Sequence, residues 1–273
     1  MSSIDIARVT ALIEGVAAEV VMPRFRSADR FAAIEKTGPA DVVTQADLDA
    51  ERLLTPALAA MLPGSRVVGE EACSENPEVM RAIAGDAPVW IIDPVDGTLN
   101  FAAGLPLFGV MVALVQGGET LAGWIHDPVA GWTARAERGS GAFVGDRRLK
   151  VAKAPSLAYM SGIPNIRFGE PEFAVHVVRQ LKKLGSWIMM RSAAQEYVAV
   201  AEGRVDFAYF QRTYPWDHAP GALIVEEAGG VVRRMDNGAR YRPGDLDVAA
   251  PMMAAPDDER FGWLRDEIFT PKP

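Results

Sequence analysis

Apolar residues in the first part of the chain recur with the spacing of amphipathic helices. Five of them lie three or four positions apart: Ile6, Val9, Ile13, Val16 and Val20. This spacing predicts a helix over residues 4–22, and the same periodicity predicts a second helix over residues 44–61. The runs VVGEE (67–71) and VWIID (89–93) are short and apolar until they end in acidic residues, which predicts buried strands.

The pattern becomes β-rich between residues 107 and 151. Apolar runs typical of strands alternate there with four turn signals: Gly117-Gly118, Asp127-Pro128, Gly139-Ser140 and Gly145-Asp146. This order predicts an antiparallel meander, in which each strand pairs with the strand before it.

Strand and helix patterns alternate after Pro155. The predicted elements are a strand near 157–161, a helix over 172–184, a strand at 187–190, a helix over 193–202, a strand at 205–210 and a helix from 217. Such alternation indicates an α/β layer. We therefore expect a mixed α+β or α/β fold, in which a large antiparallel sheet is followed by a smaller mixed sheet with helices. The predicted boundary separates an N-terminal part, residues 1–152, from a C-terminal part, residues 153–273.

Composition and charge narrow the class of protein. The chain has 273 residues, of which 49% are hydrophobic and 23% charged, as in ordinary soluble globular proteins. A net charge of −8 disfavours nucleic acid or an anionic membrane as the main partner. The longest apolar-rich stretch, 105–115, is shorter than the ~20 residues of a membrane-spanning helix, and residues 1–15 lack a signal-peptide pattern. The single cysteine, Cys73, excludes an intrachain disulfide and favours a reducing compartment, so we expect a cytoplasmic protein.

The stretch WIIDPVDGTLNF, residues 90–101, carries a predicted buried strand directly into two aspartates. An unpaired charge at the end of a core strand is costly, so Asp93 and Asp96 predict a bound cation. Gly97-Thr98 could open a short helix whose free N–H groups bind an anion. Mg²⁺ between carboxylates and a phosphate would satisfy both groups, since it prefers oxygen ligands. The alternative is a simple turn, because Asp-Pro and Asp-Gly are common turn dipeptides.

Four further acidic residues, in three segments, lie in similar contexts. Glu70 and Glu71 follow the apolar VVG, although a solvated acidic loop would have the same pattern. Asp47 stands three residues after Thr44, which also satisfies the capping-box pattern of a helix start. Asp217 opens an apolar helix, where the helix dipole favours an aspartate in any case. Each position therefore has a structural alternative, and their order in one chain carries the functional interpretation.

Four segments together resemble the signatures of the inositol monophosphatase family. They are DVVTQAD (41–47), GEE (69–71), WIIDPVDGTLNF (90–101) and WDHAPGALIVEEAGG (216–230). The resemblance implies a layered α-β-α-β-α sandwich and a Mg²⁺-dependent, lithium-sensitive phosphomonoesterase that acts on a small phosphorylated metabolite. It further implies a homodimer.

The resemblance also implies a role for each matching residue. Two or three Mg²⁺ ions per site would be held by the side chains or, for the valine, the carbonyl of Glu70, Asp93, Val95, Asp96 and Asp217. The amides of Gly97 and Thr98 would hold the phosphate. Thr98 and Asp47, near Glu70, would orient and deprotonate the attacking water, so these three residues are the predicted catalytic residues. Lys36 could approach the phosphate, although a solvated loop lysine has the same pattern.

The substrate is the least constrained part of the prediction. Members of the family that use inositol phosphate typically carry a glutamate seven residues before the aspartate of the WD pair, and here that position is Phe210. A phenyl ring cannot accept hydrogen bonds from ring hydroxyls. Gln195 and Glu196, at the start of a predicted helix, are therefore further candidates for substrate contacts, with exposed helix-start positions as the alternative.

Several functions stay open at this point. Inositol monophosphate or a related polyol phosphate is the expected substrate. Histidinol phosphate is an alternative if Glu196 pairs with its ammonium group. A bisphosphate, either 3′-phosphoadenosine 5′-phosphate or fructose 1,6-bisphosphate, is another, with Arg167, Arg191 and Arg212 as candidate anchors. An alternative of a different class is a non-catalytic regulatory binding protein on the same scaffold.

Overall fold

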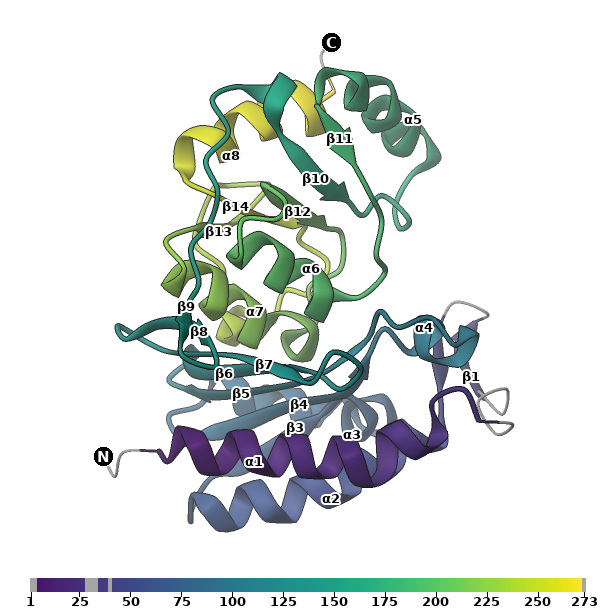
Figure 1. The fold of residues 1–273 in the computed structure, drawn as a ribbon, viewed down its shortest axis with the longest axis vertical. Coiled ribbons are helices and arrows are strands. Elements are labelled where there is room, and N and C mark those ends of the chain that lie inside the picture. Colours follow the sequence, from purple (N-terminus) through teal and green to yellow (C-terminus); the bar gives the residue numbers. More distant parts are fainter. Residues whose placement is uncertain (1–3, 28–33, 39–40, 272–273) are drawn as a thin grey trace.

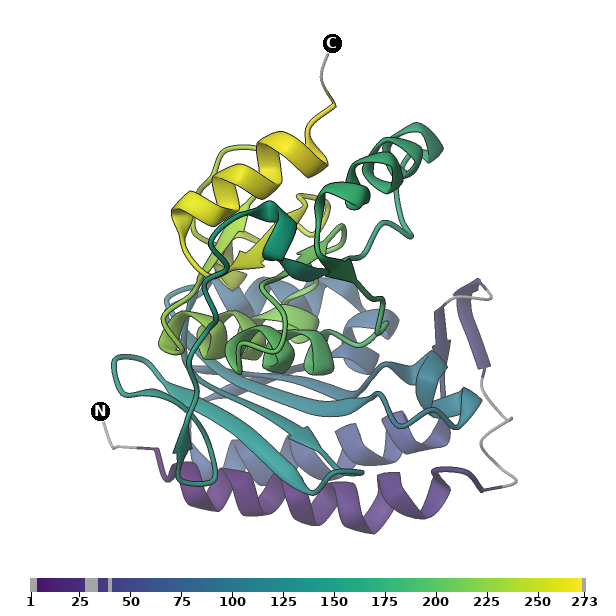
Figure 2. The same ribbon diagram turned by 45° about the horizontal axis from the view of Figure 1, so that its top comes forward.

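Five layers stack in the order helices, sheet, helices, sheet, helices (Figure 1). The structure, a computed structural model, describes residues 4–27, 34–38 and 41–271. Figure 2 shows the helical layer that separates the two sheets. The expected mixed fold with a large and a smaller sheet is confirmed. Within the described residues, no helix is long and apolar enough to cross a membrane.

The first layer consists of two helices on the outer face of the large sheet. α1 (Ile6–Val16) continues through a π-helical turn, and α2 (Gln45–Met61) begins at the expected capping box. Thr44 accepts a hydrogen bond from an amide of the first turn, and Asp47 accepts one from the Thr44 amide. Buried side chains of both helices pack on the sheet in one apolar cluster with Trp90 and Trp124.

The large sheet has seven strands in sequence order. They are β3 (Arg66–Gly69), β4 (Val89–Asp96), β5 (Gly109–Gln116), β6 (Glu119–Asp127), β7 (Trp132–Glu137), β8 (Gly141–Val144) and β9 (Arg147–Arg148). The meander from β5 to β9 is antiparallel, as expected. The expected large antiparallel sheet is antiparallel from β4 to β9, and only the edge strand β3 departs from this pattern, because it runs parallel to β4. A crossover through α3 (Glu70–Glu75) and a 3-10 segment (Pro77–Ala84) makes this parallel pairing feasible.

The second sheet has five strands in the order β11-β10-β12-β14-β13. They are β10 (Ser161–Pro164), β11 (Ser186–Trp187), β12 (Phe207–Phe210), β13 (Val231–Arg234) and β14 (Met252–Ala255). Parallel and antiparallel pairs both occur, as expected for a mixed sheet. The strand expected at 157–161 begins only at Ser161, after a 3-10 turn, and the strand expected at 187–190 is reduced to Trp187 at the end of β11.

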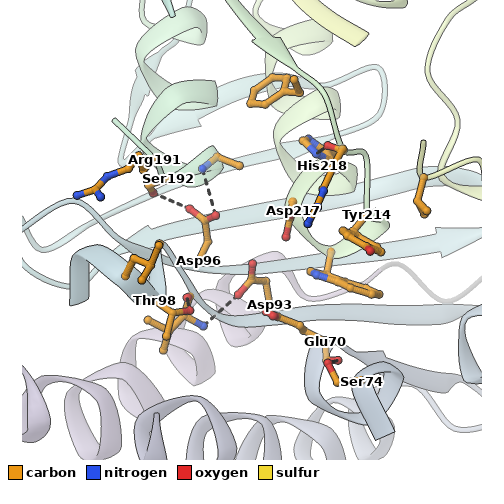
Figure 3. A pocket seen from close by; sticks show the side chains of 18 of the residues that line it. Glu70, Ser74, Asp93, Asp96, Thr98, Arg191, Ser192, Tyr214, Asp217 and His218 are labelled. Atoms are coloured by element: carbon orange, nitrogen blue, oxygen red, sulfur yellow. Dashed lines mark hydrogen bonds between the residues drawn. The ribbon is translucent and has the colours of Figure 1, made fainter. Parts of the chain in front are cut away.

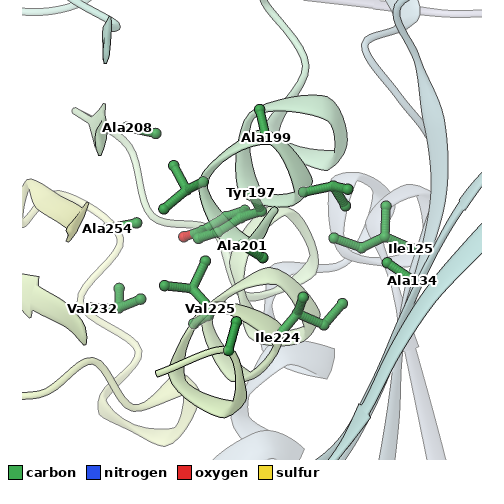
Figure 4. Packing of buried hydrophobic residues seen from close by; sticks show 14 of the residues in the cluster. Ile125, Ala134, Tyr197, Ala199, Ala201, Ala208, Ile224, Val225, Val232 and Ala254 are labelled. Atoms are coloured by element: carbon green, nitrogen blue, oxygen red, sulfur yellow. The ribbon is translucent and has the colours of Figure 1, made fainter. Parts of the chain in front are cut away.

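Helices on both sides of the second sheet complete the layers. α6 (Ala193–Ala201) and α7 (Pro215–Glu227) lie between the two sheets, while α5 (Pro171–Gln180) and α8 (Asp258–Leu264) cover the outer face (Figure 1). One apolar cluster reaches from Ile125 of the large sheet to Ala254 of the second (Figure 4). The chain crosses between the sheets after β9, and the boundary at residue 152 stays a prediction.

Glycines allow the middle layer to pack closely. A Cβ added at Gly123 of β6 would lie 2.8 Å from Cα of Pro220 in α7. A Cβ added at Gly221 would lie 2.2 Å from Cγ of Tyr197, which is fully buried on α6. Neither distance leaves room for a side chain. Gly123 therefore lets α7 approach the large sheet closely, and Gly221 lets α7 approach α6 closely.

The same glycine-to-alanine change is therefore expected to have opposite effects in two helices. Gly221→Ala should lower the free energy of unfolding by about 1–3 kcal/mol, because Tyr197 must move out of a packed core. Gly15→Ala in α1, where no atom lies within 4 Å of the new Cβ, should raise it by roughly 0.5–1 kcal/mol. Urea unfolding of both variants measures the difference; equal effects would contradict this account of the middle layer.

Candidate active site

One large cavity opens where β3 and β4 of the large sheet end and where α6 and α7 begin (Figure 3). Its volume is about 960 Å³. Most of the predicted site residues line it: Glu70, Asp93, Val95, Asp96, Gly97, Thr98, Glu196, Phe210 and Asp217. Val42 and Val43 of the first segment line it as well, so all four sequence segments that resemble family signatures supply residues to one region, although they lie far apart in the chain.

A β-bulge at the end of β4 turns two aspartates toward this cavity. Asp93 pairs with Met111 of β5, whereas Asp96 pairs with Gly109, so three steps on β4 oppose two steps on β5. In a regular strand, side chains three positions apart would point to opposite faces. The bulge at Pro94-Val95 allows Asp93 and Asp96 to share one face. The Val95 amide also donates to Asp93 Oδ1 at 3.1 Å.

The start of α6 holds the Asp96 carboxylate. The Ser192 hydroxyl donates to Asp96 Oδ2 at 2.5 Å, and the amides of Ala193 and Ala194 donate to the two carboxylate oxygens at 3.1 and 2.8 Å. Ser192 is the N-cap residue of α6, and its hydroxyl also accepts from the Gln195 amide. The sequence prediction missed Ser192, although a serine before a helical run is a known capping signal.

Asp217 completes an acidic cluster with Asp93 and Asp96. It stands in the first turn of α7, and carboxylate oxygens of the three residues all lie within 4.8 Å of one another. Glu70, the first residue of α3, lines the same cavity beside Asp93 but is not a member of this three-residue group (Figure 3). Oxygen donors at this spacing are suited to a hard divalent cation.

Glu51 of α2 positions the segment that carries Glu70. Its buried carboxylate accepts hydrogen bonds of 2.9 Å from the amides of Glu71 and Ala72, at the start of α3. A Cβ at Gly69 would lie 2.1 Å from Glu51 Cδ, so only glycine leaves room for this contact. No local sequence pattern marks Glu51, because the contact joins residues twenty positions apart.

Thr98 and Asp47 are neighbours at the turn that follows β4. The Thr98 hydroxyl is 3.0 Å from the Val95 carbonyl oxygen and 3.3 Å from Asp47 Oδ1. Asp47 therefore both completes the capping box of α2 and neighbours Thr98. Gly97 has φ +87°, and a Cβ there would lie 2.8 Å from the Leu107 carbonyl oxygen. This turn leads into the short helix α4 (Thr98–Ala103), which confirms the expected helix start.

Burial and mutual repulsion favour the protonated forms of these carboxyl groups when no cation is present. Burial, followed by the charges of Glu70, Asp96 and Asp217, raises the pKa of Asp93 well above its ordinary value. Burial also raises the pKa of Asp96, against the opposing hydrogen bonds from α6. The pKa of Asp47 is raised to about 7, mainly by burial. A bound cation would reverse this preference by favouring the charged forms.

The two residues next to Asp217 in the chain, Trp216 and His218, have structural roles. His218 Nε2 donates to the Arg212 carbonyl oxygen at 2.8 Å, and its Nδ1 accepts from the Tyr197 hydroxyl at 3.0 Å, so both ring nitrogens are engaged. Burial lowers the pKa of His218 to about 3, which keeps the ring neutral. Trp216 stacks on Tyr214 with ring centroids 4.9 Å apart. These contacts give His218 and Trp216 structural roles.

The predicted substrate contacts divide into two groups. Glu196 and Phe210 line the cavity, whereas Gln195 is not among its lining residues. The Gln195 amide instead donates to Asp127 Oδ2 at 2.8 Å and to the Phe108 carbonyl oxygen at 3.0 Å, which ties α6 to the large sheet. All three candidate arginines line the cavity: Arg167, Arg191 and Arg212. The side chain of Lys36, in β1 (Ile34–Gly38), lies outside the described residues.

The layered fold and this acidic site together define a class of phosphoric monoester hydrolases. The chain belongs to the inositol monophosphatase family, whose family profile matches residues 2–262. This match confirms the family and the class of enzyme that the sequence segments predicted.

Individual relatives carry several names within the family. A fructose-1,6-bisphosphatase/inositol-1-monophosphatase from Thermotoga maritima is 37% identical over 199 residues, covering 72% of this chain and 73% of the relative. A histidinol-phosphatase from Chlorobaculum parvum is 36% identical over 193 residues, covering 69% and 70%. The solved structure of an IMPase from Thermotoga maritima is 30% identical, with a TM-score of 0.78 and coverage of 96% and 94%.

The raised pKa of Asp47 predicts how stability depends on pH in the cation-free protein. A group with a higher pKa in the folded state binds protons better there, so its stabilising effect is lost as pH rises from about 4 through about 7. In EDTA, the free energy of unfolding should fall between pH 5 and pH 8, with roughly 2–4 kcal/mol of the fall due to Asp47.

Asp47→Asn should reduce this fall, because the amide is neutral at both pH values. Urea unfolding in EDTA at pH 5 and pH 8 measures it. Asp146→Asn, on an exposed turn, is the matched control and should leave the pH difference as in the unchanged protein. An identical pH difference in Asp47→Asn and the unchanged protein would contradict the prediction.

Proposed function

We propose that this protein is a Mg²⁺-dependent phosphomonoesterase whose substrate is a small polyol phosphate such as inositol monophosphate. The convergence of Asp93, Asp96 and Asp217 within 4.8 Å, in a cavity of about 960 Å³, is the observation that carries this proposal. Family membership supports the reaction class, and the cavity is large enough for a metabolite-sized ester.

The donor set fits Mg²⁺. Carboxylate oxygens of the three aspartates, with Glu70 beside Asp93 and the Val95 carbonyl at the bulge, would hold two or three ions. Hard oxygen donors of this kind suit Mg²⁺ better than softer metals. When bound, such ions lower the pKa of water and offset negative charge on the attacking and leaving oxygens.

Thr98 and Asp47 are the residues proposed to orient and deprotonate the attacking water. The Thr98 hydroxyl proton is directed to the Val95 carbonyl or to Asp47 Oδ1, so the lone pairs of Oγ1 can accept a hydrogen bond from water. Asp47, with a pKa of about 7, is suited to receive the proton of the water near neutral pH, and Glu70 lies close enough to share this role.

The turn at Gly97 is the proposed phosphate-binding element. Gly97 and Thr98 both line the cavity, next to the acidic cluster. Their amides at the start of α4 would donate to phosphate oxygens, and the positive φ of Gly97 sets the direction of this turn. A carboxylate cluster and an anion site can be neighbours only if cations lie between them.

We also propose that the enzyme is a cytoplasmic homodimer. The family resemblance of the sequence segments supports the dimer. A single buried cysteine, Cys73, supports a reducing compartment.

A bisphosphate is the second candidate substrate, and the three arginines of the cavity wall support it. Arg212 lies 4.0 Å from the centroid of the Phe168 ring, and Arg191 donates to Asn100 Oδ1 at 3.0 Å, so both guanidinium groups are held in place. Guanidinium groups bind phosphate strongly. The Thermotoga relative bears the name of a fructose bisphosphatase as well as of an inositol monophosphatase.

The central test is Asp93→Asn. Removing one carboxylate of the cluster should lower kcat for phosphate release by about 10²-fold or more in the presence of Mg²⁺. In EDTA the same variant should melt at a higher temperature than the unchanged protein, because repulsion at a buried site is relieved. This combination separates loss of the site from loss of the fold.

The assay should include inositol 1-phosphate, histidinol phosphate, 3′-phosphoadenosine 5′-phosphate and fructose 1,6-bisphosphate. EDTA should abolish phosphate release and added Mg²⁺ should restore it, while Asp146→Asn should behave as the unchanged protein. Near-normal turnover by Asp93→Asn would defeat the assignment. Absence of release from every ester, together with a stable partner in a pull-down, would favour a regulatory binding protein.

Arg212→Gln tests the second candidate substrate. If a guanidinium anchors a second phosphate, kcat/KM for fructose 1,6-bisphosphate should fall at least about tenfold more than kcat/KM for inositol 1-phosphate. Arg52→Gln, on a side chain that is 73% exposed outside the cavity, is the control. An equal effect of Arg212→Gln on both esters would reject this role.

A further inference from the structure

Glu196 is a buried acid, and one of its two carboxyl oxygens lacks a hydrogen-bond partner in the part of the chain that the structure describes. The residue is 1% exposed and belongs to the cavity lining. Asn165 Nδ2 donates to Glu196 Oε2 at 2.6 Å. Among the described residues, Glu196 Oε1 has no hydrogen-bond partner. A buried polar atom of this kind costs about 1–3 kcal/mol, so it calls for a partner that the protein itself does not supply.

The position of Glu196 on α6 relates it to the acidic cluster. Its amide donates to the Ser192 carbonyl oxygen at 3.0 Å, which is the hydrogen bond of one helical turn. Ser192 in turn donates through its hydroxyl to Asp96. Side chains four positions apart on a helix lie roughly 6 Å apart on the same side. Glu196 is therefore about one turn away from the cluster, within reach of a group a few bonds from a bound phosphate.

The neighbouring wall on β12 is apolar. Phe210 is 5% exposed and stacks on Tyr197 of α6, with ring centroids 4.8 Å apart. Its ring cannot donate or accept an ordinary hydrogen bond. A carboxyl group is thus available on α6, whereas the adjacent position on β12 offers only an aromatic ring.

We propose that Glu196 Oε1 forms a hydrogen bond with a hydroxyl or ammonium group on the alcohol portion of the phosphate ester, close to the ester carbon. This inference rests on the proposed phosphomonoesterase function and adds a residue that determines specificity. Asn165 acts as a positioning residue, because it fixes Oε2 and leaves Oε1 for the substrate. An ester without such a donor would leave Oε1 unpaired, which selects against it.

Glu196→Gln tests the proposal through a ratio of rates. Each protein is assayed with inositol 1-phosphate, which offers hydroxyl groups, with histidinol phosphate, which offers an ammonium group, and with 4-nitrophenyl phosphate, which offers neither. The readout is kcat/KM for each donor-bearing ester divided by kcat/KM for 4-nitrophenyl phosphate. Glu196→Gln should lower this ratio at least about tenfold for the ester that uses the contact.

A contact with a hydroxyl group and a contact with an ammonium group give different results in this assay. A fall in the ratio confined to histidinol phosphate identifies an ammonium group, and a fall confined to inositol 1-phosphate identifies a hydroxyl group. Unchanged ratios for both esters would overturn the proposal, and so would an equal loss on all three substrates, which indicates a structural role. Glu202→Gln, at the end of the same helix and paired with Arg147 and Arg204, is the control and should keep both ratios.

Two further measurements keep the inference testable. If Glu196→Gln does not fold, Asn165→Ala should shift the same ratio in the same direction, because Glu196 then loses its positioning hydrogen bond. If the unchanged protein hydrolyses none of the esters, the proposed function fails while the contact can still be measured. Calorimetric titration of inositol 1-phosphate and histidinol phosphate into the unchanged protein and Glu196→Gln then decides, and equal Kd values for both ligands would reject the contact.

Discussion

Repulsion among Asp93, Asp96 and Asp217 is the constraint around which the site is organised. Two unit charges about 4 Å apart repel by roughly 4 kcal/mol at an effective dielectric near 20, and these carboxylate oxygens lie within 4.8 Å of one another. Burial adds the cost of desolvation, which raises the pKa of Asp93 and Asp96. The arrangement is favourable only with protons or cations present, and a bound cation would favour the charged forms of the carboxylates.

The protein tolerates this repulsion because rigid elements hold each carboxylate in place. The bulge on β4 directs Asp93 and Asp96 to one face, and three hydrogen bonds from the start of α6 fix Asp96. Asp217 is presented by the first turn of α7, which packs against the large sheet through Gly123. The short distances between the carboxylates thus depend on the close packing of the helices, since a less tightly packed middle layer would let the carboxylates separate.

Local signals in the sequence were sufficient for part of this arrangement. The capping box of Thr44 and Asp47, the buried strand before Asp93 and the helix start at Thr98 depend on neighbouring residues, and each was predicted correctly. The parallel pairing of β3 with β4, the support of α3 by Glu51 and the hold of Ser192 on Asp96 depend on contacts across the fold. Periodicity carries no information on such contacts. For the same reason Gln195 could not be separated from Glu196, because only the packed helix shows that the first faces Asp127 and the second the cavity.

The wall that would contact the alcohol portion of a substrate is built separately from the acidic cluster. Glu196 belongs to α6, Phe210 to β12 and Arg212 to the segment that follows β12, and none of them is a member of the three-aspartate group. A substitution on this wall can change which ester is accepted while the carboxylates keep their geometry. The link between the two regions is the first turn of α6, where Ser192 holds Asp96 and Glu196 follows one turn later. If the proposed roles of Glu196 and Asp96 hold, substrate selection and cation binding meet on a single helix, and a shift of α6 would disturb both at once.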